Sequence, residues 1–184
     1  MSAMDNRLPS FHIRAAGTAD NTLLAELGAE TFFDSFSAEN SAENMAAYLA
    51  ASFSPEIQAR ELADPATRFL IAEAHGQLAG YARLRLGPAP AIVAARRPIE
   101  IVRFYARKVW IGQGVGASLM QACLGEAGRL GCDAVWLDVW ERNPRAIAFY
   151  RKWGFVEVGA QEFRLGDEVQ RDLVMAQFTT HQAA

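Results

Sequence analysis

Three glycines alternate with other residues at positions 112–116, which read GQGVG and stand between a strand-like segment and a long helical pattern. Glycine reaches positive φ at little cost and lets the main chain approach a bulky group closely. The first N–H groups of the following helix lack intrahelical acceptors and lie at the positive end of its dipole. The segment therefore predicts a diphosphate-binding turn. A glycine cluster alone is also consistent with a tight turn that binds nothing.

Two other phosphate sites fit this turn less well. A P-loop needs Lys followed by Ser or Thr after its last glycine, and Ala117-Ser118 stands there instead. The pattern Gly112-x-Gly114-x-x-Ala117 satisfies a relaxed dinucleotide-binding fingerprint, with Asp133 and Asp138 downstream as candidate ribose ligands. However, too few residues follow the turn to complete a doubly wound sheet, and the strands before it have an antiparallel pattern. A nicotinamide-dependent oxidoreductase is therefore the weaker interpretation.

Length and composition favour a single domain over residues 1–184, with a core at about 10–178 and flexible termini. About half of the 184 residues are hydrophobic, and the net charge of −3 argues against a nucleic-acid partner. No apolar run is long enough for a membrane span, and the first residues lack a signal-peptide pattern. Cys123 and Cys132 are expected to be reduced thiols in a cytoplasmic protein. The three histidines are scattered, so no metal site is expected.

The hydrophobic periodicity predicts an α/β (α+β) fold with strands and helices in the order β, helices, β-β-β, α, β, α, β-β. Thr18, Ser41 and Ser54 are candidate N-caps for the early helices, and Asn143 for a late one. The arginines of residues 78–86 alternate with apolar residues, as an antiparallel hairpin requires. The other expected elements are strands at 11–14, 69–74, 99–106, 134–139, 155–163 and 168–178 and a helix at 114–130.

Three segments resemble the successive cofactor motifs of GNAT acetyltransferases: Glu100–Ala106, the glycine turn and Asn143–Phe155. Further segments are similar to the narrower group of PaiA-like acetyltransferases, which is associated with polyamine acetylation: Phe32–Phe36, Asn40–Glu43, Trp136–Asn143, Gly166–Glu168 and Asp172–Met175. The resemblance implies a GNAT fold with a mixed, mostly antiparallel sheet of about seven strands. It further implies helices on both faces, a central β-α-β cofactor unit, and acetyl-CoA as cosubstrate.

The resemblance assigns a set of residues to cofactor binding. The strand ending at Ala106 is implied to splay from its parallel neighbour and to pair its free backbone with the pantetheine arm. A backbone N–H near Tyr105 or Ala106 would then polarise the thioester carbonyl. The cofactor-binding residues implied are Phe104, Tyr105, Ala106, Ile111, Gly112, Gln113, Gly114, Val115, Gly116, Asn143 and Tyr150. Ile111 departs from the family pattern, which has Gln or Arg there, so one polar contact to the cofactor is in doubt.

The resemblance also suggests catalytic and acceptor-binding residues. Tyr150 is implied to be the general acid for the leaving thiolate, although it is also consistent with a core tyrosine. Glu100 is the candidate general base, acting through water, and is equally consistent with a surface glutamate paired to an arginine. Three acids of the early helices are candidates to bind a polyamine, namely Asp34, Glu39 and Glu43. A solvated helix face is the plainer interpretation of these acids.

The predicted reaction is acetyl transfer to a small-molecule primary amine, with a polyamine such as spermidine as first candidate. No serine lies in a nucleophile elbow and Cys123 belongs to an apolar helix face, so direct attack in a ternary complex is expected. Peptide α-amines, amino acids and amino-bearing antibiotics are alternative acceptors. A non-catalytic acyl-CoA sensor is an alternative from another class. Homodimers are common in the family, and the sequence leaves the oligomeric state open.

Overall fold

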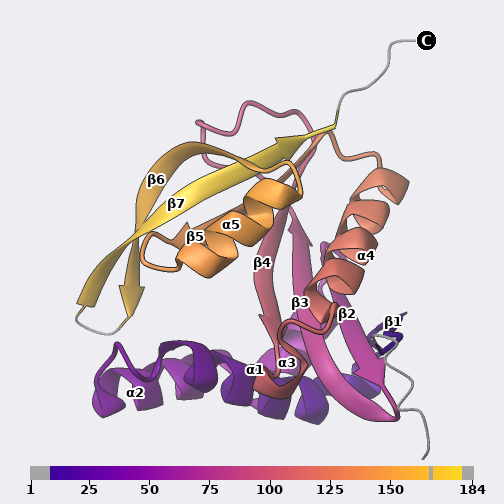
Figure 1. The fold of residues 1–184 in the computed structure, drawn as a ribbon, viewed down its shortest axis with the longest axis vertical. Helices are drawn as coiled ribbons and strands as arrows, with labels where there is room; N and C mark the ends of the chain where they lie inside the picture. Colours follow the sequence, from indigo (N-terminus) through magenta and orange to yellow (C-terminus); the bar gives the residue numbers. More distant parts are fainter. Residues whose placement is uncertain (1–8, 166–167, 180–184) are drawn as a thin grey trace, which may run out of the picture.

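The computed structural model describes residues 9–165 and 168–179. Gly166 and Asp167, the predicted flexible ends and His181 lie outside these residues. The described chain forms these strands and helices, drawn in Figure 1: β1 (His12–Ala15), α1 (Asn21–Phe36), α2 (Ala42–Ser52), α3 (Pro55–Ala63), β2 (Thr67–Ala74), β3 (Gln77–Leu86), β4 (Pro98–Ala106), α4 (Val115–Arg129), β5 (Ala134–Trp140), α5 (Pro144–Lys152), β6 (Val156–Leu165) and β7 (Glu168–Phe178).

The strands form one seven-stranded sheet in the order β1-β2-β3-β4-β5-β7-β6. Every neighbouring pair is antiparallel except β4 and β5, which α4 connects as a β-α-β unit. This arrangement confirms the predicted fold class and the mixed, mostly antiparallel sheet. Over the described residues, every helix is too short or too polar to cross a membrane.

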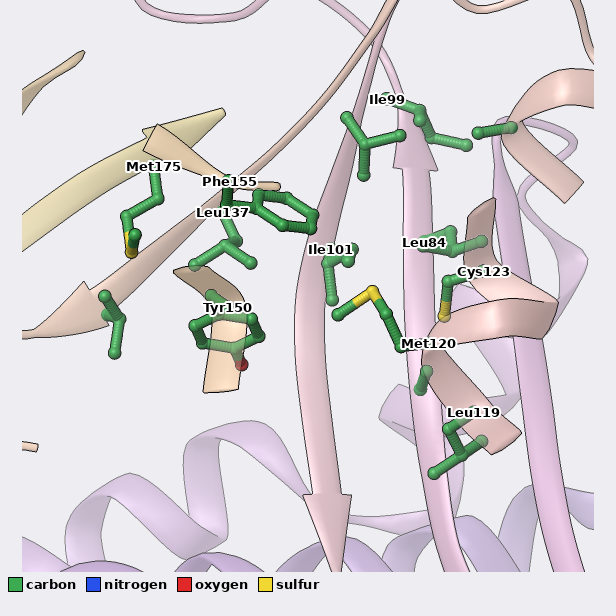
Figure 2. Close-up of a cluster of buried hydrophobic side chains, with 14 of the residues drawn as sticks. Leu84, Ile99, Ile101, Leu119, Met120, Cys123, Leu137, Tyr150, Phe155 and Met175 are labelled. Atoms are coloured by element: carbon green, nitrogen blue, oxygen red, sulfur yellow. The ribbon is translucent and has the colours of Figure 1, made fainter. Parts of the chain in front are cut away.

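Helices cover both faces of the sheet. Successive residues of each strand point to opposite faces, so one strand contributes side chains to the core on either side. Ala72 and Ala82 pack in the core cluster that contains the buried face of α4, while their neighbours Ile71 and Tyr81 pack against α1. Figure 2 shows the α4 side of this core, where Met120 and Cys123 meet the strand residues. The burial of Cys123 agrees with its prediction as a core thiol. The site described below lies between helices α1 and α2 and helices α4 and α5.

Most predicted helix starts are confirmed, and one is wrong. The hydroxyl groups of Ser41 and Ser54 each accept a hydrogen bond from a backbone N–H in the first turn of α2 and α3, at 3.2 Å in both cases. Thr18, by contrast, does not cap α1, since residues 18–20 form a 3-10 turn and the helix begins at Asn21. Asp20 explains the difference, because its carboxylate accepts the Gly17 N–H at 2.7 Å and closes that turn.

The centre of the sheet carries two irregularities in β4. Arg83 pairs with Arg103 and Leu84 with Ile101, so Val102 is an extra residue opposite β3, a β-bulge. On its other side β4 pairs with β5 only from Pro98 to Glu100, although both strands continue. The two strands then diverge, as Figure 1 shows. The predicted splay of β4 from β5 is therefore confirmed, and it leaves main-chain groups of β4 free on the β5 side.

Candidate active site

A cleft of about 870 Å³ opens where β4 and β5 diverge. One side of the cleft, which we call the donor side, is formed by the glycine turn, the end of β4 and α5. The other side, the acceptor side, is formed by α1, α2 and the β5–β7–β6 part of the sheet. Of the predicted catalytic and cofactor residues, only Gln113 does not line this cleft. Those that line it are Glu100, Phe104, Tyr105, Ala106, Ile111, Gly112, Gly114, Val115, Gly116, Asn143 and Tyr150.

The glycine turn has the backbone geometry that a diphosphate site needs. Gly112 and Gly114 have φ values of +82° and +99°, which side chains strongly disfavour. The first intrahelical hydrogen bond of α4 joins Ser118 N–H to the Gly114 carbonyl at 3.1 Å, so the preceding helical N–H groups have no partner within the helix. A Cβ atom on Gly116 would lie 3.3 Å from the Phe149 ring. Glycine at this position therefore lets α4 and α5 approach each other beside the cleft.

The side chains of the turn add little to this backbone site. Ile111 is 37% exposed at the cleft and offers no hydrogen-bond donor beyond its main chain. The Gln113 amide donates to the Val109 carbonyl, within the turn itself. Gln113 thus stabilises the loop, and the structure gives it no position on the cleft wall from which to replace the missing polar residue at 111.

Helix α5 brings Asn143 and Tyr150 to the donor side. The Asn143 side chain caps α5 by accepting the Ala146 N–H at 3.1 Å, as predicted. Tyr150 is 8% exposed, and its ring lies 6.1 Å from that of Phe104 and 5.8 Å from that of Phe155. Its hydroxyl points away from Phe155 (Figure 2). Burial raises the pKa of Tyr150, so this phenol stays protonated at neutral pH.

Glu100 has both of the surroundings considered for it. Its carboxylate lines the cleft and accepts a 2.6 Å hydrogen bond from the Arg85 guanidinium. The side chain of Glu100 is 14% exposed and that of Arg85 is 49% exposed. The Arg85 guanidinium therefore already engages one oxygen of the Glu100 carboxylate.

The three acids of the early helices do not line the cleft. Asp34 pairs with Lys108, with its Oδ1 atom 3.1 Å from Nζ. Glu39 and Glu43 are exposed near the start of α2. Their proposed role in binding the acceptor therefore has no support from the shape of the site, and other acids occupy that position.

Two carboxylates line the acceptor side: Asp138 on β5, which is half-buried, and Asp172 on β7, which is buried. Each has one oxygen, Oδ1, that is buried and has no hydrogen-bond partner among the described residues. Burial raises the pKa of both carboxyl groups to about 6, and for Asp138 the nearby charges of Asp172 and Glu100 add to the shift. A hydrogen bond from Gln161 to the other oxygen of Asp138 opposes it. These are groups that exchange protons near neutral pH.

Both carboxylates lie in segments that resemble PaiA-like enzymes, and the sequence contains a further signal for a functional role that the resemblance did not assign to them. Asp138 is the one charged residue of Ala134–Trp140, an otherwise apolar strand in the middle of the sheet. Asp172 directly precedes the buried run Leu173–Ala176. Because an isolated charge is costly to bury, an acid in such a strand indicates a functional position.

Aromatic rings form the remaining wall of the acceptor side. The ring centroids of Phe36 and Trp140 are 6.3 Å apart, and those of Tyr48 and Phe163 are 6.0 Å apart. Tyr105 joins this group from β4, with its ring 6.5 Å from that of Phe36. The cleft therefore combines carboxylates with apolar and aromatic surface, a combination that suits an organic cation.

Comparisons with known proteins agree with this geometry. Residues 28–155 match the model of the acetyltransferase (GNAT) family. An uncharacterised N-acetyltransferase of Mycobacterium bovis is 34% identical over 152 residues, which cover 83% of this chain and 93% of that protein. A probable spermine N(1)-acetyltransferase of Bacillus subtilis subsp. natto is 28% identical over 95 residues, 51% of this chain and 62% of that protein.

A solved structure shares the fold. The PaiA N-acetyltransferase from Thermoplasma acidophilum, in complex with coenzyme A, superposes with a TM-score of 0.71 at 20% identity and covers 92% of this chain and 99% of its own. The family match agrees with the strand–turn–helix unit and the diverging strands, which suit acetyl-CoA as cosubstrate and the transfer of its acetyl group to an amine. The chain belongs to the GNAT acetyltransferase family and is an acetyl-CoA-dependent N-acetyltransferase.

Proposed function

We propose that this enzyme acetylates a primary amine of a polyamine. The observation that carries the proposal is the set of four carboxylates, Glu100, Asp138, Glu162 and Asp172, that line one aromatic-walled cleft. Such a site favours a flexible organic cation over a neutral or anionic acceptor. The resemblance to PaiA-like enzymes and to the Bacillus spermine acetyltransferase supports the same class.

On the donor side, the proposal gives the main chain the principal role. The free N–H groups at the start of α4 bind the diphosphate, with Asn143 beside them, and the unpaired backbone of Phe104–Ala106 receives the pantetheine arm. Bound acetyl-CoA supplies the acetyl thioester. A β4 N–H near Tyr105 or Ala106 donates to the carbonyl oxygen and stabilises the charge that develops there.

For the proton transfers we propose Asp138 as the base in place of Glu100. Asp138 lines the cleft and has one oxygen without a hydrogen-bond partner among the described residues, whereas Arg85 holds the Glu100 carboxylate. The ammonium group loses one proton to Asp138, and the free amine attacks the carbonyl carbon. The C–S bond then breaks while Tyr150 protonates the sulfur. The excess proton on nitrogen restores the phenol, and Asp138 releases its proton to solvent.

A thiol-release assay with a panel of amines tests this function. The purified protein with acetyl-CoA should release thiol fastest with spermidine or spermine, and more slowly with an alanyl peptide or an amino-bearing antibiotic. Fastest release with the peptide or the antibiotic would contradict the polyamine assignment. Thermal stabilisation by acetyl-CoA without thiol release from any amine would instead support the acyl-CoA sensor.

Replacing Tyr150 by Phe tests the acid. The variant keeps the ring packing against Phe104 and Phe155 and loses only the hydroxyl, so kcat should fall about tenfold to one-hundredfold with KM for acetyl-CoA nearly unchanged. Parallel steady-state titrations of both substrates measure this. An equal loss in kcat and in acetyl-CoA affinity would remove the proposed acid role.

A further inference from the structure

A structural role does not explain why the Asp172 carboxylate is buried with an oxygen that lacks a hydrogen-bond donor within the described part of the chain. It is 9% exposed, lines the cleft, and its Oδ1 has no hydrogen-bond partner among the described residues. A buried carboxylate oxygen without a donor is costly, so a donor from outside the chain is the expected remedy. Neither the acid nor the base of the proposed reaction accounts for it, since Asp138 and Tyr150 fill those roles.

The sheet register places Asp172 two residues along β7 from Val174, the residue that pairs with the proposed base Asp138. Asp138 pairs directly with Val174, and Trp140 pairs directly with Asp172. Directly paired residues of an antiparallel ladder share a face, so Asp138, Trp140 and Asp172 all point into the same cleft. Asp138 and Asp172 are diagonal neighbours, which places their Cα atoms roughly 7 Å apart.

We propose that Asp172 and Trp140 form a second cation subsite, which anchors the distal ammonium of a diamine acceptor while Asp138 faces the amine that reacts. This inference rests on the proposed function and adds to it the residues that recognise the second charge. The ring of Trp140, with Phe36 at 6.3 Å, supplies an aromatic face for the cation and for the methylene groups that precede it.

The distance between the two carboxylates sets the length of acceptor that fits. An extended chain advances roughly 1.2 Å per bond, so the five bonds of a four-carbon diamine span roughly 6 Å. That span is close to the diagonal Cα separation of Asp138 and Asp172, so one such diamine can place an ammonium group beside each carboxylate.

Three amines of equal length test the subsite: 1,4-diaminobutane, 4-amino-1-butanol and butylamine. With the wild-type enzyme, kcat/KM for the diamine should exceed that for the amino alcohol by about tenfold or more, beyond the factor of about two that two equivalent amines give. Asp172→Asn should remove this preference, so that the diamine and the amino alcohol react with similar kcat/KM, while KM for acetyl-CoA stays nearly unchanged.

Glu141→Gln is the matched control. Glu141 lies beside Trp140, pairs with Arg171 at 2.8 Å and does not line the cleft. Its charge contributes to the raised pKa of Asp172, so its loss favours the ionised form of Asp172 and the preference for the diamine should persist. Equal rates for diamine and amino alcohol with the wild-type enzyme would overturn the subsite even if Asp172→Asn does not fold. A preference that survives in Asp172→Asn would also overturn it. Absence of thiol release with all three amines and with spermidine would contradict the proposed function itself.

Discussion

The donor and acceptor sides of one cleft are built from different materials. On the donor side the groups that face the ligand are main-chain atoms of the glycine turn and β4, which the alternating glycines and the divergence of β4 from β5 expose. On the acceptor side they are side chains, namely carboxylates and aromatic rings. Main-chain donors suit a ligand that never changes, whereas side chains can be exchanged without disturbing the fold. The comparison indicates that acceptor preference is decided by a few positions on β5 and β7.

The two sides also differ in their effect on stability. Residues 111–116 contain no titratable side chain, whereas Asp138 and Asp172 both have pKa values raised to about 6. The native state then binds more protons than the unfolded chain between about pH 4 and pH 6. The free energy of unfolding therefore falls as pH rises through that window, and these carboxylates destabilise the protein at neutral pH.

Asp138→Asn should give the largest effect and separates the two sides most clearly. Removing the base should lower kcat about one-hundredfold to one-thousandfold, with KM for acetyl-CoA unchanged. In the wild type, kcat/KM for the amine should rise with pH through an apparent pKa near 6, as Asp138 becomes ionised, and this limb should be absent in the variant. Rate measurements from pH 5 to pH 9 check both statements.

The same variant should be more stable than the wild type at pH 7.5, by about 1 kcal/mol after allowance for solvent screening, because a buried charge is removed. Denaturant unfolding at pH 5 and pH 7.5 measures this gain, which should shrink at the lower pH. A wild-type rate with an intact pH limb would assign the base to Glu100 instead and would end the proposed division of roles between the carboxylates.

Gly114→Ala tests the donor side by itself. An alanine at φ +99° is strained, so the turn should open and KM for acetyl-CoA should rise about tenfold, with little change in amine preference. Gly125→Ala is the matched control within α4, where an added Cβ has no neighbour within 4 Å. It should raise stability by about 0.5–1 kcal/mol and leave both KM values unchanged. Similar acetyl-CoA affinity for Gly114→Ala and wild type would show that the turn conformation is not needed for binding.

The sequence predicts one side of the cleft far better than the other, and the physical reason lies in how each is encoded. The glycine turn, the Asn143 cap and the splayed end of β4 are contiguous motifs, so local pattern and family resemblance locate them. Asp138 and Asp172 meet only through the register of β5 against β7, which depends on the whole sheet. The family resemblance, which implies an acceptor site at the early helices, suggested Asp34, Glu39 and Glu43, and the structure pairs Asp34 with Lys108 outside the cleft.

Ile111→Arg should give the smallest effect and sharpens the donor side rather than breaking it. If the turn binds phosphate through its main chain, a guanidinium at this exposed position adds a charge-assisted contact, and KM for acetyl-CoA should fall about twofold to fivefold. The gain should vanish in high salt, because exposed charges are screened. Ile111→Gln, which adds donors without charge, should give a smaller gain that salt does not remove. An unchanged KM at low ionic strength in both variants would place the diphosphate away from residue 111, and kcat should stay constant throughout because the acceptor side is untouched.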